Sequence, residues 1–352
     1  MLSGAQDRSA FRAPILDLVY TRLGGVAHKA DLVLIDSALR ATSTDPDQRI
    51  TYFLRRTRCE QLYYQGLLDE SMVEAERARR IAMELKDSAL IASSLNQVAV
   101  LMEERNDNVQ GIVLLKEALR WYPNHIGHIY PLATPYRIQG NLGLCWAKIG
   151  EIDSALTCQK RSLELARGAH APRGEALALL KLGHLEKLRT RTDSALLLFD
   201  RSIAVANANG IRDVLLEALS AKAETYAQEG RVNEMEAILT KAHTVMNAHG
   251  DIAPRSVLSF LKSEMHSLAR VGQYENALAS ARSWRTLDRS MRSAAARTAQ
   301  SILQEMHDTD ADLADEYDRA AITAAELKAE GRIRMILMIG GTLAVILLVA
   351  LV

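Results

Sequence analysis

A repeat with a period near 40 residues is the feature that most limits how this chain can fold. The stretch "EIDSALTCQKRSLELA", which begins at Glu151, aligns without gaps with "RTDSALLLFDRSIAVA", which begins at Arg191. The preceding residues align as well, since the Leu-Gly pair at 142–143 matches the pair at 182–183. Repeats of this length indicate a stack of similar supersecondary units.

Turn residues recur with the same period. They are Gly66, Asn106, Gly150, Thr190, Gly230 and Gly272, with Gly25-Val26 as an earlier position. Five of the six spacings are 40 to 42 residues, and the spacing from Asn106 to Gly150 is longer, at 44. Apolar-periodic segments lie on both sides of a turn, as in 136–150 and 151–166, so each unit is expected to be a helical hairpin.

The composition agrees with an all-α fold. Aromatic residues make up only 5% of the chain, while alanine and leucine dominate between arginine, glutamate and lysine, and these residues favour helices. Small residues recur where two helices must approach closely, and large ones follow about one turn later, which lets neighbouring helices interlock. The small positions are Gly143, Gly183, Ala223, Ala155 and Ala195, and the large ones are Trp146, Tyr226, Phe199 and Leu239.

These residues resemble the tetratricopeptide (TPR) repeat family. The matching positions are Leu142, Gly143, Trp146 and Ala155 in one unit, Leu182, Gly183, Ala195 and Phe199 in the next, Ala223 and Tyr226 in a third, and Pro123 at the end of an earlier one. The period exceeds the family's usual length of about 34 residues, which longer helices would explain. The resemblance implies a solenoid of about seven hairpins over residues 10–285, with a concave inner face. A different helical-hairpin solenoid is the alternative and would leave the architecture almost unchanged.

The resemblance also implies a ligand-binding groove on the first helix of each hairpin. The inward positions, carried over by register, are Arg56, Asn96, Arg137, Asn141, Lys148, Lys181, His184 and Lys187. Such a basic, hydrogen-bonding set suits an acidic or carboxy-terminal peptide. The lysine and asparagine clamp of chaperone-binding TPR domains is not reproduced, because Glu60 and Glu224 stand where donors are needed. Ordinary solvated helix surface therefore stays open as the alternative.

No motif in the sequence predicts an enzyme or a cofactor site. We find no phosphate-binding glycine loop, nucleophile elbow or metalloprotease helix. His125 and His128 have metal-ligand spacing but no third ligand nearby, so an irregular loop is expected there. The cysteines, Cys59, Cys145 and Cys158, are expected to be packing residues. The 43 basic and 43 acidic residues balance, so nucleic acid is not an expected partner.

The character of the sequence changes after Gly272. Four arginines at three- and four-residue spacing form a stripe, namely Arg282, Arg285, Arg289 and Arg292. A strongly acidic stretch follows, and neither contains Pro or Gly before Gly331, so residues 286–334 are expected to form a long charged linker helix. A weak coiled-coil seam, formed by Leu313, Tyr317, Ala320, Ala324 and Leu327, makes a homodimer an open alternative to a solvated linker.

Residues 335–352 contain no charged side chain, and 18 residues span about 27 Å as a helix, close to the thickness of a bilayer core. We therefore predict one transmembrane helix, with Gly340 and Ala344 as a small-residue contact between two such helices. Residues 1–9 are expected to be disordered, or to be the remnant of a signal peptide.

Two functions follow from these expectations. The first is a membrane-anchored scaffold that binds a protein or peptide in its groove. The alternative is the input half of a receptor, since the chain resembles the membrane-anchored TPR sensors of bacteria, whose helix-turn-helix or histidine-kinase output is missing from this sequence. Arg332 and Arg334 favour a cytoplasmic solenoid by the positive-inside rule, whereas the resemblance to sensors favours a periplasmic one. The ligand itself is not identified by the sequence.

Overall fold

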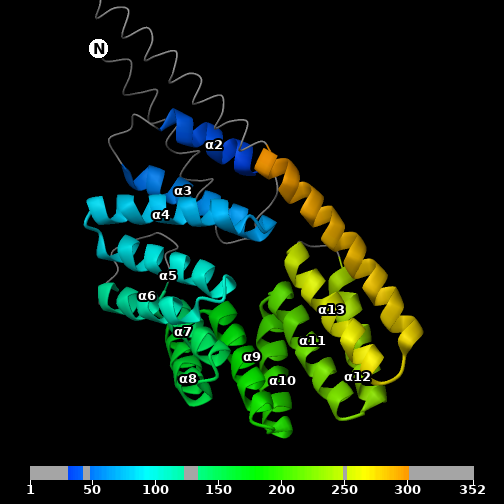
Figure 1. Ribbon diagram of the computed structural model, residues 1–352. Helices are drawn as coiled ribbons and strands as arrows, with labels where there is room; N and C mark the ends of the chain where they lie inside the picture. Colours follow the sequence, from blue (N-terminus) through cyan, green and yellow to red (C-terminus); the bar gives the residue numbers. More distant parts are fainter. Residues whose placement is uncertain (1–30, 43–47, 123–133, 249–251, 301–352) are drawn as a thin grey trace, which may run out of the picture. The chain divides into compact units, whose positions relative to one another are not determined.

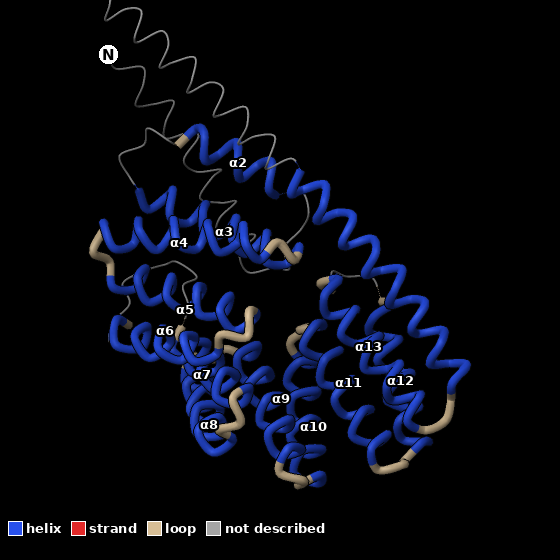
Figure 2. Tube along the Cα trace, in the orientation of Figure 1, coloured by secondary structure: helices blue, strands red, loops and turns tan. Residues whose placement is uncertain are grey.

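The computed structural model describes residues 31–42, 48–122, 134–248 and 252–300. Within these ranges the chain is helical apart from short turns, and no strand occurs (Figures 1 and 2). The helices are α2 (Asp31–Ala41), α3 (Gln48–Gln65), α4 (Leu68–Glu84), α5 (Ser88–Glu104), α6 (Asn108–Trp121), α7 (Pro135–Lys148), α8 (Ile152–Gly168), α9 (Pro172–Leu188), α10 (Thr192–Ala208), α11 (Arg212–Gln228), α12 (Val232–Asn247) and α13 (Pro254–Arg270). Residues 274–300 are also helical.

Consecutive helices form hairpins that stack on their neighbours. The hairpins are α3 with α4, α5 with α6, α7 with α8, α9 with α10, and α11 with α12. The second helix of each of the first four also packs on the first helix of the next hairpin. The all-α hairpin architecture expected from the sequence is therefore confirmed for the described residues.

The turns inside the hairpins lie at the predicted positions. Gly66, Asn106, Gly150, Thr190, Gly230 and Gly272 all have φ between 58° and 87°. At Gly150, for example, the N–H of Glu151 donates to the carbonyl of Trp146 at 3.0 Å, and the N–H of Gly150 donates to the carbonyl of Ala147 at 3.1 Å. This pair of bonds is the Schellman motif, which ends a helix by placing one residue in the left-handed region.

The connections between hairpins are also marked by residues with positive φ and by prolines that begin the next helix. Lys86, His170 and Gly210 take positive φ angles at the ends of α4, α8 and α10. Pro135, Pro172 and Pro254 begin α7, α9 and α13, where proline is tolerated because the first helical N–H has no partner within the helix. The breaks between helices are thus encoded locally.

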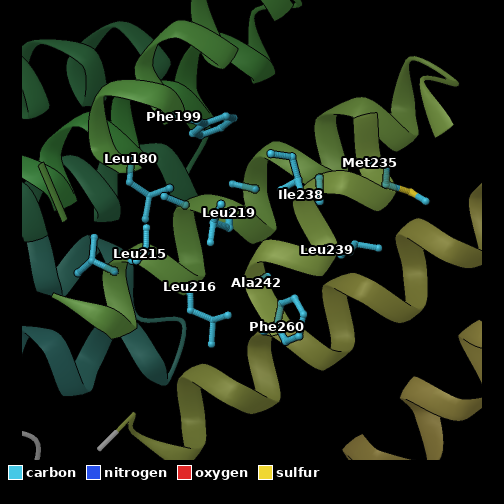
Figure 3. Packing of buried hydrophobic residues seen from close by; sticks show 14 of the residues in the cluster. Leu180, Phe199, Leu215, Leu216, Leu219, Met235, Ile238, Leu239, Ala242 and Phe260 are labelled. Atoms are coloured by element: carbon cyan, nitrogen blue, oxygen red, sulfur yellow. The ribbon is translucent and has the colours of Figure 1, made fainter. Parts of the chain in front are cut away.

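Small and large residues interlock in the core as the repeat pattern predicts. Gly183 of α9 lies against the ring of Phe199 of α10, which is fully buried. Figure 3 shows Phe199, Leu216 and Phe260 among the side chains of the core cluster that runs from α9 to the helical residues 274–300. A second cluster, centred on Tyr52 and Phe53, joins α2 to α7.

Several predictions lie outside the described residues. They concern the amino-terminal residues 1–9, the linker and coiled-coil seam beyond residue 300, the segment 335–352, and its contact pair Gly340 and Ala344. Helical residues 274–300 continue past the predicted domain boundary at 285, and that boundary stays a prediction.

The membrane location predicted from the sequence has to be corrected. Among the residues that the structure describes, no helix combines the length and the apolar character that crossing a bilayer requires. The prediction depended on an apolar segment that the structure does not describe, so a membrane location has no part in the function proposed below.

Candidate functional site

The predicted groove residues lie on the first helices α3, α5, α7 and α9. Their environments differ more than the sequence suggests. Arg56 and Asn96 are buried, with 5% and 6% exposure, whereas Arg137 and Lys148 are exposed. The half-buried members are Asn141, Lys181, His184 and Lys187.

Two side-chain amides join successive first helices. Asn141 Nδ2 of α7 donates to Asn96 Oδ1 of α5 at 2.9 Å. Gln97 Nε2, also from α5, donates to the backbone carbonyl of Arg56 in α3 at 3.2 Å. Asn96 and Asn141 thus meet directly, and Gln97 links α5 to the backbone of α3; we call these three side chains the amide row.

Three of the predicted cations are already paired. Arg56 donates to Glu60 at 2.9 Å, and Lys187 donates to Glu224 at 2.9 Å. Lys148 forms an ion pair with Glu103 of α5. Glu60 and Glu224, which the sequence placed at the groove as unfavourable acids, thus neutralise neighbouring cations.

His184 does not contribute positive charge. Burial, together with the charges of Lys181 and Lys187, lowers its pKa to about 3. Its ring meets the ring of Phe199 edge to face, with the centroids 5.3 Å apart. A neutral imidazole in this position acts mainly in packing.

A second group of side chains, which the sequence analysis missed, gathers around Tyr64. We call it the Tyr64 cluster: Tyr64 of α3, Arg137 of α7, Arg173 of α9, and Asp213 and Glu217 of α11. The charges of Glu60, Arg137, Arg173 and Asp213 all act on the phenol of Tyr64, and the charge of Glu217 acts on Arg173. The cluster therefore collects groups from four different hairpins.

Within the Tyr64 cluster one salt bridge is well formed. Arg173 Nη1 and Nη2 donate to the two carboxylate oxygens of Asp213 at 2.8 and 2.5 Å. Burial would raise the pKa of Asp213, but the hydrogen bonds and charge of Arg173 outweigh it, and the pKa is lowered. Such a bidentate pair is held in one geometry.

Two other members of the Tyr64 cluster, Glu217 and Tyr64 itself, have pKa values that burial raises. For Glu217, the positive charge of Lys181 offsets only part of the increase that burial causes. Burial also raises the pKa of Tyr64, although the residue keeps 44% of its surface exposed. Tyr64 is therefore partly shielded by its surroundings yet open to an approaching ligand.

A polar contact near the cluster joins hairpins that are far apart in sequence. Arg255 of α13 donates to both carboxylate oxygens of Glu104 of α5, at 2.7 and 2.8 Å. The guanidinium also lies 4.7 Å from the ring centroid of Tyr63, whose hydroxyl donates to Glu104 at 2.7 Å. Repeats in a solenoid usually contact only their neighbours, so this contact is a departure from that rule.

The sequence carried a signal for part of the Tyr64 cluster. Arg173 and Asp213 are separated by 40 residues, one repeat period, and opposite charges at equivalent positions predict a contact between neighbouring hairpins. Tyr64 had no comparable signal, because its neighbours come from helices that begin 71 to 148 residues later.

The described residues hold no group of three or more His, Cys, Asp or Glu side chains that could bind a metal ion. His125 and His128 lie outside those residues. Cys59, Cys145 and Cys158 are free thiols, and burial raises the pKa of Cys145 to about 11. The thiols are consistent with the packing role expected from the sequence.

Comparisons with known proteins identify the fold. No family model matches the sequence, and no curated protein matches it. The apo form of RapI is similar in structure, with a TM-score of 0.57, 14% identity, and coverage of 80% of this chain and 97% of the other. A Rap protein complexed with competence and sporulation factor has a TM-score of 0.54 and 14% identity, with coverage of 81% and 85%.

A third structure, aspartyl phosphate phosphatase F from Bacillus subtilis, has a TM-score of 0.50 and 14% identity, and 80% and 81% of the two chains are covered. These neighbours are TPR-repeat proteins. At this identity the likeness concerns the fold, so the described residues form a TPR-type helical-hairpin array. The TPR resemblance is thereby confirmed, whereas the resemblance to membrane-anchored sensors stays a prediction.

Proposed function

We propose that this protein is a binding scaffold that takes an extended, acidic segment of a protein or peptide along its first helices. The observation that carries the proposal is the Tyr64 cluster. Its five side chains come from α3, α7, α9 and α11, and the phenol at its centre remains 44% exposed. A ligand at this point would contact several hairpins at once.

The charges favour an anionic ligand. Among the described residues, neither Arg137 nor Lys181 has a carboxylate within ion-pair distance, whereas Arg56, Lys148, Arg173 and Lys187 each have one. Arg137 is exposed and Lys181 is half-buried. Cationic donors without a partner bind carboxylates through strong charge-assisted hydrogen bonds.

The amide row supplies a second kind of contact. An extended peptide presents unpaired N–H and C=O groups, and an asparagine side chain can both donate and accept. Asn141 is half-buried beside Arg137 on α7, so its amide is suited to the backbone of a ligand whose acidic group lies at Arg137.

The structural neighbours support binding as the role of this fold. One of them was solved as a complex with competence and sporulation factor. The receptor interpretation would use the same surface, and no observation in the described residues favours it over ligand binding alone.

The proposal is tested by fluorescence anisotropy with two pools of labelled nonapeptides, one rich in Asp and Glu and the other in Asn and Gln. We expect the acidic pool to bind more tightly, and an Arg137→Glu, Lys181→Glu variant to lose at least about tenfold in affinity, because two like charges would face the ligand. Arg201→Glu on α10, an exposed arginine outside this surface, is the control.

Equal binding of both pools, or unchanged affinity in the double variant, would contradict the proposal. Circular dichroism and thermal unfolding of each variant separate a lost ligand contact from a lost fold. The affinity of an Arg201→Glu variant should match that of the natural sequence.

A further inference from the structure

The helical residues 274–300 have one packed face and one exposed face. On the packed face Ala277 and Ser280 are buried, and Trp284 and Leu287 are half-buried against the core. Ser280 Oγ also donates to Glu264 of α13 at 2.9 Å. These contacts fix which side of the helix is turned to solvent.

The exposed face carries a regular sequence of side chains. In chain order they are Tyr274, Leu278, Arg282, Arg285, Arg289 and Arg292. At 100° per residue they fall within an arc of about 80°. Tyr274 and Leu278 are 72% and 52% exposed. We call this surface the basic face; it is apolar at its amino end and basic after that.

Most of this positive charge has no partner in the described part of the chain. Arg292 pairs with Asp288 at 2.9 Å. No carboxylate there lies within ion-pair distance of Arg282, Arg285 or Arg289, and all three are exposed. Like charges at this spacing repel one another, so an anionic partner would stabilise the face.

The sequence of this same chain contains a complementary segment. Residues 305–318 include seven Asp or Glu and no Lys or Arg, and the apolar residues Ile322 and Leu327 follow. This segment lies outside the described residues, so its complementarity to the basic face is argued from the sequence alone. Its order, acidic and then apolar, is the reverse of the order on the basic face.

We propose that the basic face binds the acidic segment 305–318 of a second copy of this chain, in an antiparallel arrangement. Aligning Arg292 with Asp308 also aligns Arg285 with Asp315, Arg282 with Asp318 and Leu278 with Ile322, because each pair of numbers sums to 600. A two-fold axis near residue 300 relates the copies, so every contact occurs twice.

The direction and the partner follow from charge and chain geometry. A parallel pairing in register would place each arginine against the same arginine of the other copy, and these like charges would repel. A fold-back within one chain would need a turn near residue 300, but residues 274–300 are helical and 274–330 contain no Gly or Pro. The inference goes beyond ligand binding, since it concerns a different surface from the Tyr64 cluster.

Charge reversal with mixing tests the arrangement on the full chain. The chain is kept in a non-ionic detergent because residues 335–352 are apolar, and its mass is measured by light scattering. One variant carries Arg285→Glu and Arg292→Glu, and the other carries Asp308→Arg and Asp315→Arg. We expect the natural chain to be a dimer, each variant alone to dissociate with a Kd at least about tenfold higher, and the equimolar mixture to form heterodimers.

The mixture is the decisive measurement, because only a pairing between two copies makes all the reversed contacts attractive at once. Recovery of dimers also shows that both variants are folded. An Arg120→Glu, Arg201→Glu variant has the same change in net charge on other exposed helices and should remain dimeric. A monomeric natural chain, variants that dimerise unchanged, or a mixture that stays monomeric would each overturn the proposal.

Discussion

Alanine at position 183 would place a methyl group against the ring of Phe199. An added Cβ would lie 2.7 Å from Phe199 Cδ1 and closer still to Cε1, whereas carbon atoms in contact normally lie 3.5 to 4.0 Å apart. The ring has 0% exposure, and it also meets His184 edge to face. It therefore has no open space into which it could move.

The expected cost of Gly183→Ala follows from two opposing effects. Forcing an extra methyl group into a packed core costs about 1–3 kcal/mol, and alanine recovers up to about 1 kcal/mol of helix propensity. We expect a net loss of about 1–2 kcal/mol in the free energy of unfolding. For an array of this size that corresponds to a fall in Tm of about 2–8 °C.

Thermal unfolding followed by circular dichroism measures this change. Gly168→Ala is the matched control, because nothing lies within 4 Å of its added Cβ and its φ is not positive; its Tm should not fall. Phe199→Leu combined with Gly183→Ala should lose less than the sum of the two single changes, since the clash is relieved. A Tm for Gly183→Ala equal to or above that of the natural chain would refute the packing argument.

Three further predictions concern polar groups and thiols. The hydrogen bond from His243 to Glu264, at 2.5 Å, raises the pKa of His243. The stabilisation that this bond gives the folded chain is therefore full below the unfolded pKa of about 6.5, and it is lost as pH rises through the folded pKa. A His243→Gln variant should lose this slope of Tm against pH, and an unchanged slope would exclude His243 as its source. Burial raises the pKa of Cys59 to about 12 and of Cys145 to about 11, so both thiols should resist iodoacetamide at pH 8 until the chain unfolds, as mass spectrometry would show. Arg255→Ala and Glu104→Ala should be less than additive in unfolding free energy, by about 0.5 kcal/mol or more; full additivity would count against their direct contact.

The positions of the turns could be predicted because they depend on neighbouring residues. Glycine at 66, 150, 230 and 272 adopts positive φ without a steric penalty. Thr190 shows that the repeat itself, and not glycine alone, identified the turn, since it takes a φ of 58° at the equivalent position. Helix termini of this kind follow from local backbone chemistry.

The candidate site was only partly predictable. Register on the first helices predicted Arg137 and Lys181 as groove cations, and neither has an ion-pair partner among the described residues, but it treated His184 and Lys187 in the same way. Their states depend on groups from other helices, namely Phe199 and Glu224. A sequence pattern assigns a face to a residue and does not reveal which partner lies opposite it.

The amino-acid sequence by itself determined the repeat, the hairpins and the turn that ends each first helix, because these depend on residues within one period of each other. Only the tertiary structure decided which charges are paired, that charges on α7, α9 and α11 act on Tyr64, and that Arg255 reaches Glu104 across 151 residues. Those contacts depend on how successive hairpins are rotated against one another, and that rotation is the sum of many small packing preferences along the array.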